Sequence, residues 1–111
     1  MENIFEFIPK ELAKELFQPI LENPSFKLER IVSKGHCTPL GEWYDQDWNE
    51  WAILLKGEAV LCFKGDMERT TMKTGDYLYI PAHRKHRVES TSLKEETVWL
   101  ALHFFENISG N

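Results

Sequence analysis

Residues 75–90 read GDYLYIPAHRKHRVES, and no other part of the chain is as informative about its fold. Tyr77 to Ile80 reads as a short strand, and Pro81 ends it because proline cannot donate a hydrogen bond to a sheet ladder. Two histidines follow, His83 inside the turn and His86 at the start of the next strand. The stretch therefore predicts two short strands joined by a turn that carries imidazoles.

Similar strand patterns recur on both sides of this stretch. Apolar or alternating runs predict strands at residues 26–33, 51–55, 59–63, 68–72, 77–80, 87–90 and 97–105. Short strands with turn signals about every ten residues are typical of a β-sandwich or a closed barrel. The aromatic-rich segment 36–48 is longer than an ordinary connection, which favours a functional loop.

The start of the chain predicts a helix instead of a strand. Pro9 suits the first position of a helix, and Leu12, Leu16 and Ile20 recur at four-residue steps. Pro19 interrupts the pattern, so we expect a break near Phe17 and a further short turn that ends at Asn23-Pro24. The expected organisation is one domain, with an N-terminal helical segment at residues 1–25 and a β-barrel at residues 26–111.

Composition excludes several classes of partner. The chain has 111 residues, with 13 Lys and Arg against 18 Asp and Glu, and a net charge of −5. Nucleic acid is not expected, because affinity for its backbone comes mainly from Lys and Arg. A membrane is not expected either, because no apolar run reaches the roughly eighteen residues of a spanning helix.

The cysteines and the N-terminus indicate the compartment. Cys37 and Cys62 are too few for a disulfide framework. The first residues lack the basic start and apolar stretch of a secretory signal. We therefore expect a cytoplasmic protein with reduced thiols.

The stretch at 75–90 resembles the second motif of the cupin superfamily. That motif runs Gly, five residues, Pro, one residue, Gly, two residues, His, three residues, Asn. Gly75, Pro81 and His86 fall in register. His83 stands where the motif has its second Gly, and Ser90 stands where it has Asn.

An upstream stretch resembles the end of the first cupin motif. That motif closes with Glu, six residues and Gly, which Glu50 and Gly57 match. Family members with a full metal site carry His-x-His ending four residues before the Glu, where this chain has Tyr44 and Gln46. If the spacer is one residue longer, the corresponding positions are Trp43 and Asp45.

The resemblance spans about residues 26–105 and implies an all-β, double-stranded β-helix (jelly-roll) barrel with a divalent metal ion inside it. The candidate ligands are Glu50, His86, His83 and Gln46. Imidazole combined with carboxylate suits Zn, Fe(II), Ni or Mn.

Tyr44 and His103 are candidates for moving a proton beside such a metal. Tyr44 can equally form a pocket wall. His103 shares one face of its strand with Trp99 and Ala101, where a structural histidine is the alternative.

Three functions are compatible with this pattern. The first is a cupin that binds a divalent metal and a small polar molecule beside it. The second is a metal-free barrel that binds or senses a small ligand, and the third is a structural barrel without activity. We also expect a homodimer, because small jelly rolls leave sheet edges exposed.

Overall fold

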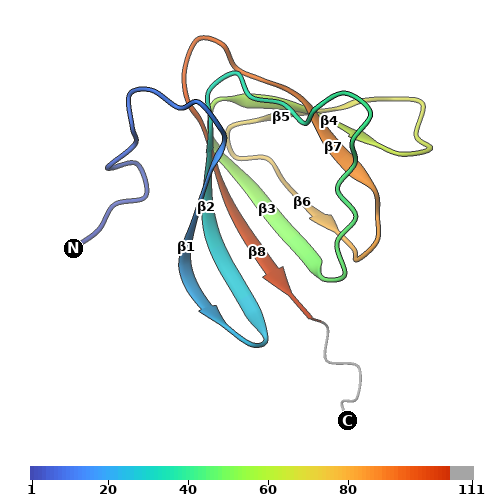
Figure 1. The fold of residues 1–111 in the computed structure, drawn as a ribbon, viewed down its shortest axis with the longest axis horizontal. Helices are drawn as coiled ribbons and strands as arrows, with labels where there is room; N and C mark the ends of the chain where they lie inside the picture. The colour runs from blue at the N-terminus through green and yellow to red at the C-terminus, as the bar shows by residue number, and fades with distance from the viewer. Residues whose placement is uncertain (106–111) are drawn as a thin grey trace.

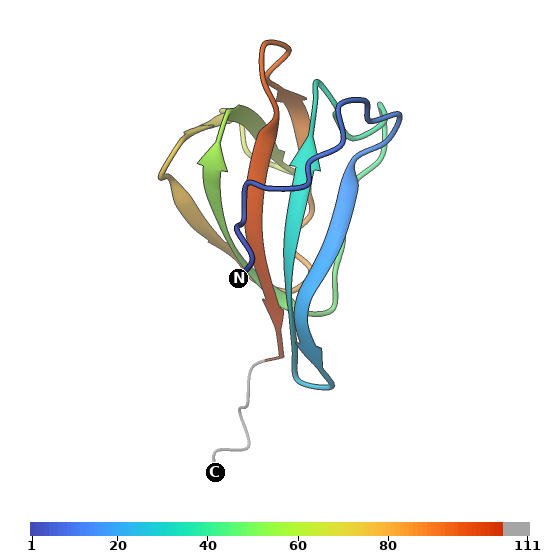
Figure 2. The same ribbon diagram turned by 90° about the vertical axis from the view of Figure 1, so that its left-hand side faces the viewer.

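The computed structural model describes residues 1–105, which form eight β-strands and contain no helix (Figure 1). The strands are β1 (Leu16–Asn23), β2 (Phe26–Ser33), β3 (Asn49–Lys56), β4 (Glu58–Phe63), β5 (Thr70–Lys73), β6 (Tyr77–Ile80), β7 (His86–Thr91) and β8 (Thr97–Phe104). They pair into a five-stranded antiparallel sheet in the order β1-β2-β8-β3-β6 and a three-stranded sheet in the order β5-β4-β7. Figure 2 shows the two layers curving toward each other. The all-β jelly-roll prediction is confirmed.

The predicted N-terminal helix is wrong. Residues Leu16–Asn23 instead form strand β1, which pairs with β2 at the edge of the larger sheet. Pro19 would break a helix, but an edge strand tolerates it where the register shifts between Pro19 and Leu21. The four-residue spacing of apolar side chains was therefore not a helical period.

A short turn fixes the hairpin between β1 and β2. The side-chain oxygen of Asn23 accepts hydrogen bonds from the backbone N–H of Ser25 at 2.7 Å and of Phe26 at 3.1 Å. Asparagine favours such turns because its side chain satisfies nearby backbone donors. The residues that had suggested the end of a helix thus make a hairpin turn.

The segment before β1 crosses the outer face of the larger sheet (Figure 2). Arg30, on β2, binds it through hydrogen bonds to the carbonyl oxygens of Ile4 at 2.9 Å and Glu6 at 2.6 Å. This contact satisfies a guanidinium whose residue is only 7% exposed.

The space between the sheets is filled by apolar side chains. They form one cluster: Ala52, Leu54, Ala59, Leu61, Met72, Trp99 and Ala101. Glu50 lies two residues before Ala52 on β3, and His103 lies two residues after Ala101 on β8. Because alternate residues of a strand share a face, these two polar side chains extend the inward rows of the core at one end. That end holds the candidate site.

No helix in residues 1–105 is long and apolar enough to cross a membrane.

Candidate functional site

A cavity of about 90 Å³ opens where the apolar core gives way to polar side chains. Its lining comes from both sheets, the segment before β1 and the loop between β2 and β3: Glu15, Phe17, Glu29, Ile31, Tyr44, Gln46, Glu50, His86, Trp99 and His103. Five of the six residues predicted from the sequence to bind the metal or move a proton line this cavity, and His83 is the one that does not. The cavity volume is below that of sites for drug-sized ligands, so the cavity suits only an ion or a small molecule.

Glu50 and His103 face each other across neighbouring strands. They are direct partners in the antiparallel register of β3 and β8, and Glu50 Oε1 lies 3.9 Å from His103 Nδ1. Both residues are buried, at 9% and 4% exposed. The fold thus brings a carboxylate and an imidazole together at the cavity wall.

His103 is held on two further sides. Its Nε2 donates to Glu29 Oε1 at 2.9 Å, and its ring stacks on Trp48 with centroids 4.7 Å apart. Its Nδ1 is buried and has no hydrogen-bond partner among residues 1–105. Burial opposes ionisation of Glu29, but the hydrogen bond from His103 and the nearby Lys27 ammonium outweigh it and lower the pKa of Glu29.

The loop between β2 and β3 is pinned against the start of β7. Tyr44 forms an isolated bridge with His86, with N–H···O distances of 2.7 and 3.1 Å. Two residues later, Gln46 Nε2 donates to Glu50 Oε1 at 3.0 Å. Both side chains therefore line the cavity, as their spacing predicts, and Gln46 orients the Glu50 carboxylate.

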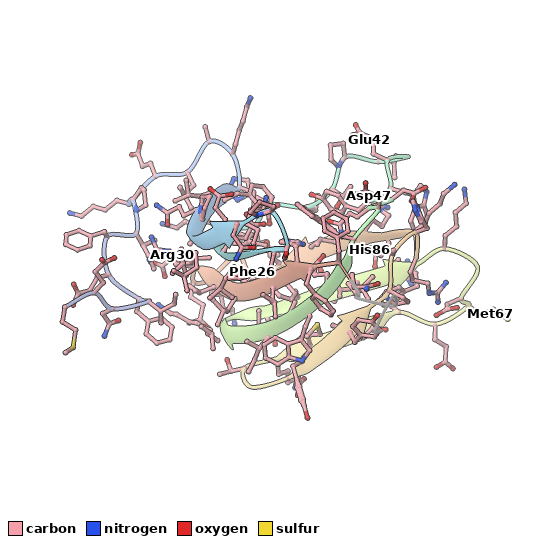
Figure 3. All side chains as sticks on the ribbon, turned by 90° about the horizontal axis from the view of Figure 1, so that it is seen from below. Phe26, Arg30, Glu42, Asp47, Met67 and His86 are labelled. Atoms are coloured by element: carbon pink, nitrogen blue, oxygen red, sulfur yellow. The ribbon has the colours of Figure 1, made fainter. Side chains whose placement is uncertain are left out.

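His86, which is labelled in Figure 3, lies at the start of β7 and lines the cavity. Its Nδ1 donates to the carbonyl oxygen of Arg84 at 2.9 Å, so Nε2 carries the lone pair in the neutral ring. The residue is 5% exposed, and its ring packs against Tyr44 and Phe63. A backbone carbonyl that fixes the tautomer in this way is the usual partner of a metal-binding histidine.

His83 lies away from this cavity. Its Nδ1 pairs with Asp45 Oδ1 at 2.9 Å, and its side chain is 67% exposed. A φ of 64° at His83 explains why the family motif has glycine at this position. The structure therefore gives His83 a role in the turn, where its backbone N–H donates to the carbonyl oxygen of Gln46 at 2.7 Å, and its side chain is not part of the cavity lining.

Two lining carboxylates were not among the predicted site residues. Glu29 shares the inward face of β2 with Ile31, and the alternation along Phe26–Ser33 could have identified it. Glu15 comes from the segment predicted to be helical, so no pattern pointed to it. Ser33 donates its hydroxyl to Glu15. Burial raises the pKa of Glu15, although the Ser33 hydrogen bond acts in the opposite direction.

The donor chemistry at the cavity fits a divalent transition metal. The donors are the Nε2 lone pair of His86, the unpartnered Nδ1 of His103 and the carboxylate of Glu50. Two imidazoles and a carboxylate suit Zn, Fe(II), Ni or Mn. Within residues 1–105 no three His, Cys, Asp or Glu side chains are already grouped as a metal cluster. Binding would require these donors to close in on the ion.

The chain matches known proteins in both sequence and structure. The sequence profile of the cupin domain family matches residues 32–103. The "putative mannose-6-phosphate isomerase" of Ralstonia eutropha JMP134 is 42% identical, with a TM-score of 0.92 over 96% of this chain and 98% of that chain. No curated protein matches the sequence.

More distant structures share the fold. A cupin superfamily protein of Desulfitobacterium hafniense is 18% identical, with a TM-score of 0.72 over 89% of this chain and 84% of that chain. A cupin with a double-stranded β-helix fold from Methanocaldococcus jannaschii is 15% identical, with a TM-score of 0.67 over 87% and 85%.

Proposed function

Because the chain belongs to the cupin family, we propose that it binds one divalent metal ion at this cavity and a small polar molecule beside the ion. The ligands in this proposal are Glu50, His86 and His103. Gln46, an expected ligand, instead orients Glu50 through its side-chain amide.

One observation carries the proposal. Three strands deliver metal-binding groups to the same small cavity, with Glu50 on β3, His86 on β7 and His103 on β8. The lone pairs of both imidazoles are left free by hydrogen bonds made at the opposite ring nitrogen. A buried nitrogen without a partner is costly unless something binds it, so His103 Nδ1 favours an occupant.

Within this site the protein residues bind and orient the ligand. When bound, the metal supplies Lewis acidity that polarises a ligand oxygen. Burial and the nearby Glu15 carboxylate raise the pKa of the Tyr44 hydroxyl, so this hydroxyl stays protonated and can donate to that oxygen. Tyr44 is thus the proton-holding group of the proposed site.

Calorimetric titration with Zn²⁺ tests the proposal. His86→Ala and Glu50→Gln should each weaken binding by more than the roughly 10- to 100-fold that loss of an outer partner costs. His83→Ala is the matched control, since His83 is exposed and pairs with Asp45, and its affinity should equal that of the wild type. Equal affinity in all four proteins would reject the assignment.

A metal-free binding barrel is the second candidate, and one contact favours it. Glu50 already receives a hydrogen bond from Gln46, at positions where family members with a full site have His-x-His. The two candidates differ in what Tyr44→His with Gln46→His would do. A metal-free barrel would gain Zn²⁺ affinity that the wild type lacks, whereas a metal-binding barrel already binds Zn²⁺ before the change.

The cysteines bear on the compartment in which the protein works. Cys37 and Cys62 are both free thiols. We propose a reducing, cytoplasmic environment for the protein on this basis.

A further inference from the structure

The charges around the cavity are of one sign. Three carboxylates line it, those of Glu15, Glu29 and Glu50, and none of its lining residues is Lys or Arg. The ammonium group of Lys27 lies 3.6 Å from Glu29 Oε2 and over the Trp48 ring, 4.9 Å from its centroid. That cation is therefore already engaged. An anionic group entering the cavity would meet carboxylates and no free cationic side chain among the lining residues that the structure describes.

The unsatisfied polar atoms of the cavity point to the same chemistry. His103, 4% exposed, keeps its Nδ1 without a partner among residues 1–105. With both rings neutral, this atom and Nε2 of His86 are hydrogen-bond acceptors, as are the carboxylate oxygens. In the metal-free cavity, an occupant that satisfies these atoms must be a hydrogen-bond donor. When a metal takes the lone pairs of His86, His103 and Glu50, the acceptors left in the lining include the carboxylates of Glu15 and Glu29, which also favour a donor.

We infer that the small molecule bound here is an uncharged polyhydroxy compound, and that phosphorylated or carboxylated compounds are disfavoured. This inference rests on the proposed function for the identity of the pocket. It also separates this chain from a sugar-phosphate ligand, which the name of the Ralstonia eutropha protein would suggest.

Hydroxyl groups suit this cavity better than an ammonium group does. A hydroxyl oxygen could coordinate a metal held by Glu50, His86 and His103 while its O–H donates a hydrogen bond to a carboxylate such as that of Glu15. An ammonium group has no lone pair for the metal and would be repelled by it. With the ion bound, the three lining carboxylates still outnumber its two positive charges, so an anionic group meets no net positive charge.

The apolar part of the lining fits the carbon skeleton of such a compound. Phe17, Ile31 and Trp99 lie beside the acceptors in the same cavity. A polyhydroxy compound presents C–H groups between its hydroxyls, so one molecule can use both parts of the wall.

Ligand-observed NMR at pH 8 with three probes tests this inference, using D-mannose, D-mannose 6-phosphate and the diamine putrescine. We expect D-mannose to bind at least roughly tenfold more tightly than its 6-phosphate, as one uncompensated like-charge contact would cause. The experiment is run on chelator-treated protein and on protein titrated with Zn²⁺. Tighter binding of the phosphate or of the diamine, or no binding of D-mannose to either form, would overturn the inference.

A charge-reversal variant makes the test specific to the cavity. Glu15→Lys places a cation in the lining and should raise the affinity for D-mannose 6-phosphate relative to D-mannose by at least roughly tenfold. Glu11→Lys makes the same charge change at an exposed position four residues earlier and should leave the ratio unchanged. Equal effects of both variants would mean that selectivity does not arise in this cavity.

The two proposals fail independently. Preference for the uncharged sugar in protein that binds no Zn²⁺ would reject metal binding and keep the ligand class. Zn²⁺ binding together with a preference for D-mannose 6-phosphate would keep metal binding and reject the ligand class. Melting temperatures of both Lys variants, measured in parallel, establish that they remain folded.

Discussion

Gly57, between β3 and β4, shows how one backbone position constrains the barrel. Its φ is +89°, and a Cβ there would lie 2.5 Å from Thr97 Oγ1 and 2.8 Å from Thr97 Cα. Only glycine adopts this conformation without strain, and only glycine leaves room for β8. The spacing from Glu50 to Gly57 in the first motif thus has a steric cause.

Gly57→Ala should therefore be strongly destabilising. We expect a loss of roughly 3 kcal/mol, because the left-handed conformation costs about 1–2 and the overpacking about 1–3 kcal/mol. Gly75→Ala is the matched control, with a φ of +94° and no atom within 4 Å of the added Cβ, and should lose only the backbone share. Urea denaturation measures both, and equal losses would contradict the steric account.

Glu15 makes stability depend on pH. Burial raises its folded-state pKa, so the folded protein holds this proton at pH values where the unfolded chain has released it. The free energy of unfolding should therefore fall as pH rises from the ordinary glutamate pKa through the raised one. Glu15→Gln should remove this loss, and be more stable than the wild type above that range but not below it. Urea denaturation from pH 4 to 8 with Glu11→Gln as control checks this, and parallel pH profiles for all three proteins would contradict it.

The sequence allowed part of the site to be predicted residue by residue. Glu50 and His86 followed from motif register, and the two-residue spacing of Tyr44 and Gln46 placed them on one face. The side chain orientation of His103 could not be predicted, because both faces of its strand carry apolar residues. It is settled by the pairing of β8 between β2 and β3, a contact between distant segments.

At the level of elements, β1 is where sequence and structure diverge most. The strands after residue 25 are indicated in the sequence by Gly-containing turns and by runs of apolar or β-branched residues. Two of them, β2 and β6, begin and end where predicted. In β1 the apolar side chains at Phe17, Ile20 and Leu21 are all exposed, so no alternation marks a buried face. β1 is a strand because it pairs with β2, and the local propensity of its residues gives no information about that pairing.

The Asn23 turn should contribute measurably to this hairpin. Asn23→Ala removes the acceptor of two backbone N–H groups and should cost about 1 kcal/mol in the free energy of unfolding. It should also speed amide exchange in β1 and β2 more than in β4 and β5. Glu22→Ala, an exposed neighbour on β1, is the control. Uniform exchange changes in all four strands would show that the turn does not act locally.

At the level of the whole molecule, both edges of the larger sheet carry exposed apolar or aromatic side chains. On β1 these are Phe17 and Leu21, at 48% and 58% exposed, and on β6 they are Tyr77 and Tyr79, at 60% and 50%. Exposed clusters of this kind favour association, although Pro19 lacks the N–H that a continuous strand pairing along β1 would use.

We therefore keep the prediction of a homodimer. Light scattering at tens of micromolar should give twice the 13.1 kDa mass of one chain. Tyr77→Glu with Tyr79→Glu should shift the mass toward the monomer if the β6 edge forms the interface, and Phe17→Glu should do so if β1 forms it. A monomer mass for the wild type would contradict the prediction.

We propose above that the cavity end of the barrel holds a divalent metal through His86 and its neighbours. The decisive measurement is the metal content of protein purified without an affinity tag, incubated with one equivalent of Zn²⁺ and desalted. We expect close to one ion per chain in the wild type and in His83→Ala, and a small fraction of that in His86→Ala. Retention that is negligible in the wild type, or that is the same in His86→Ala, would contradict it.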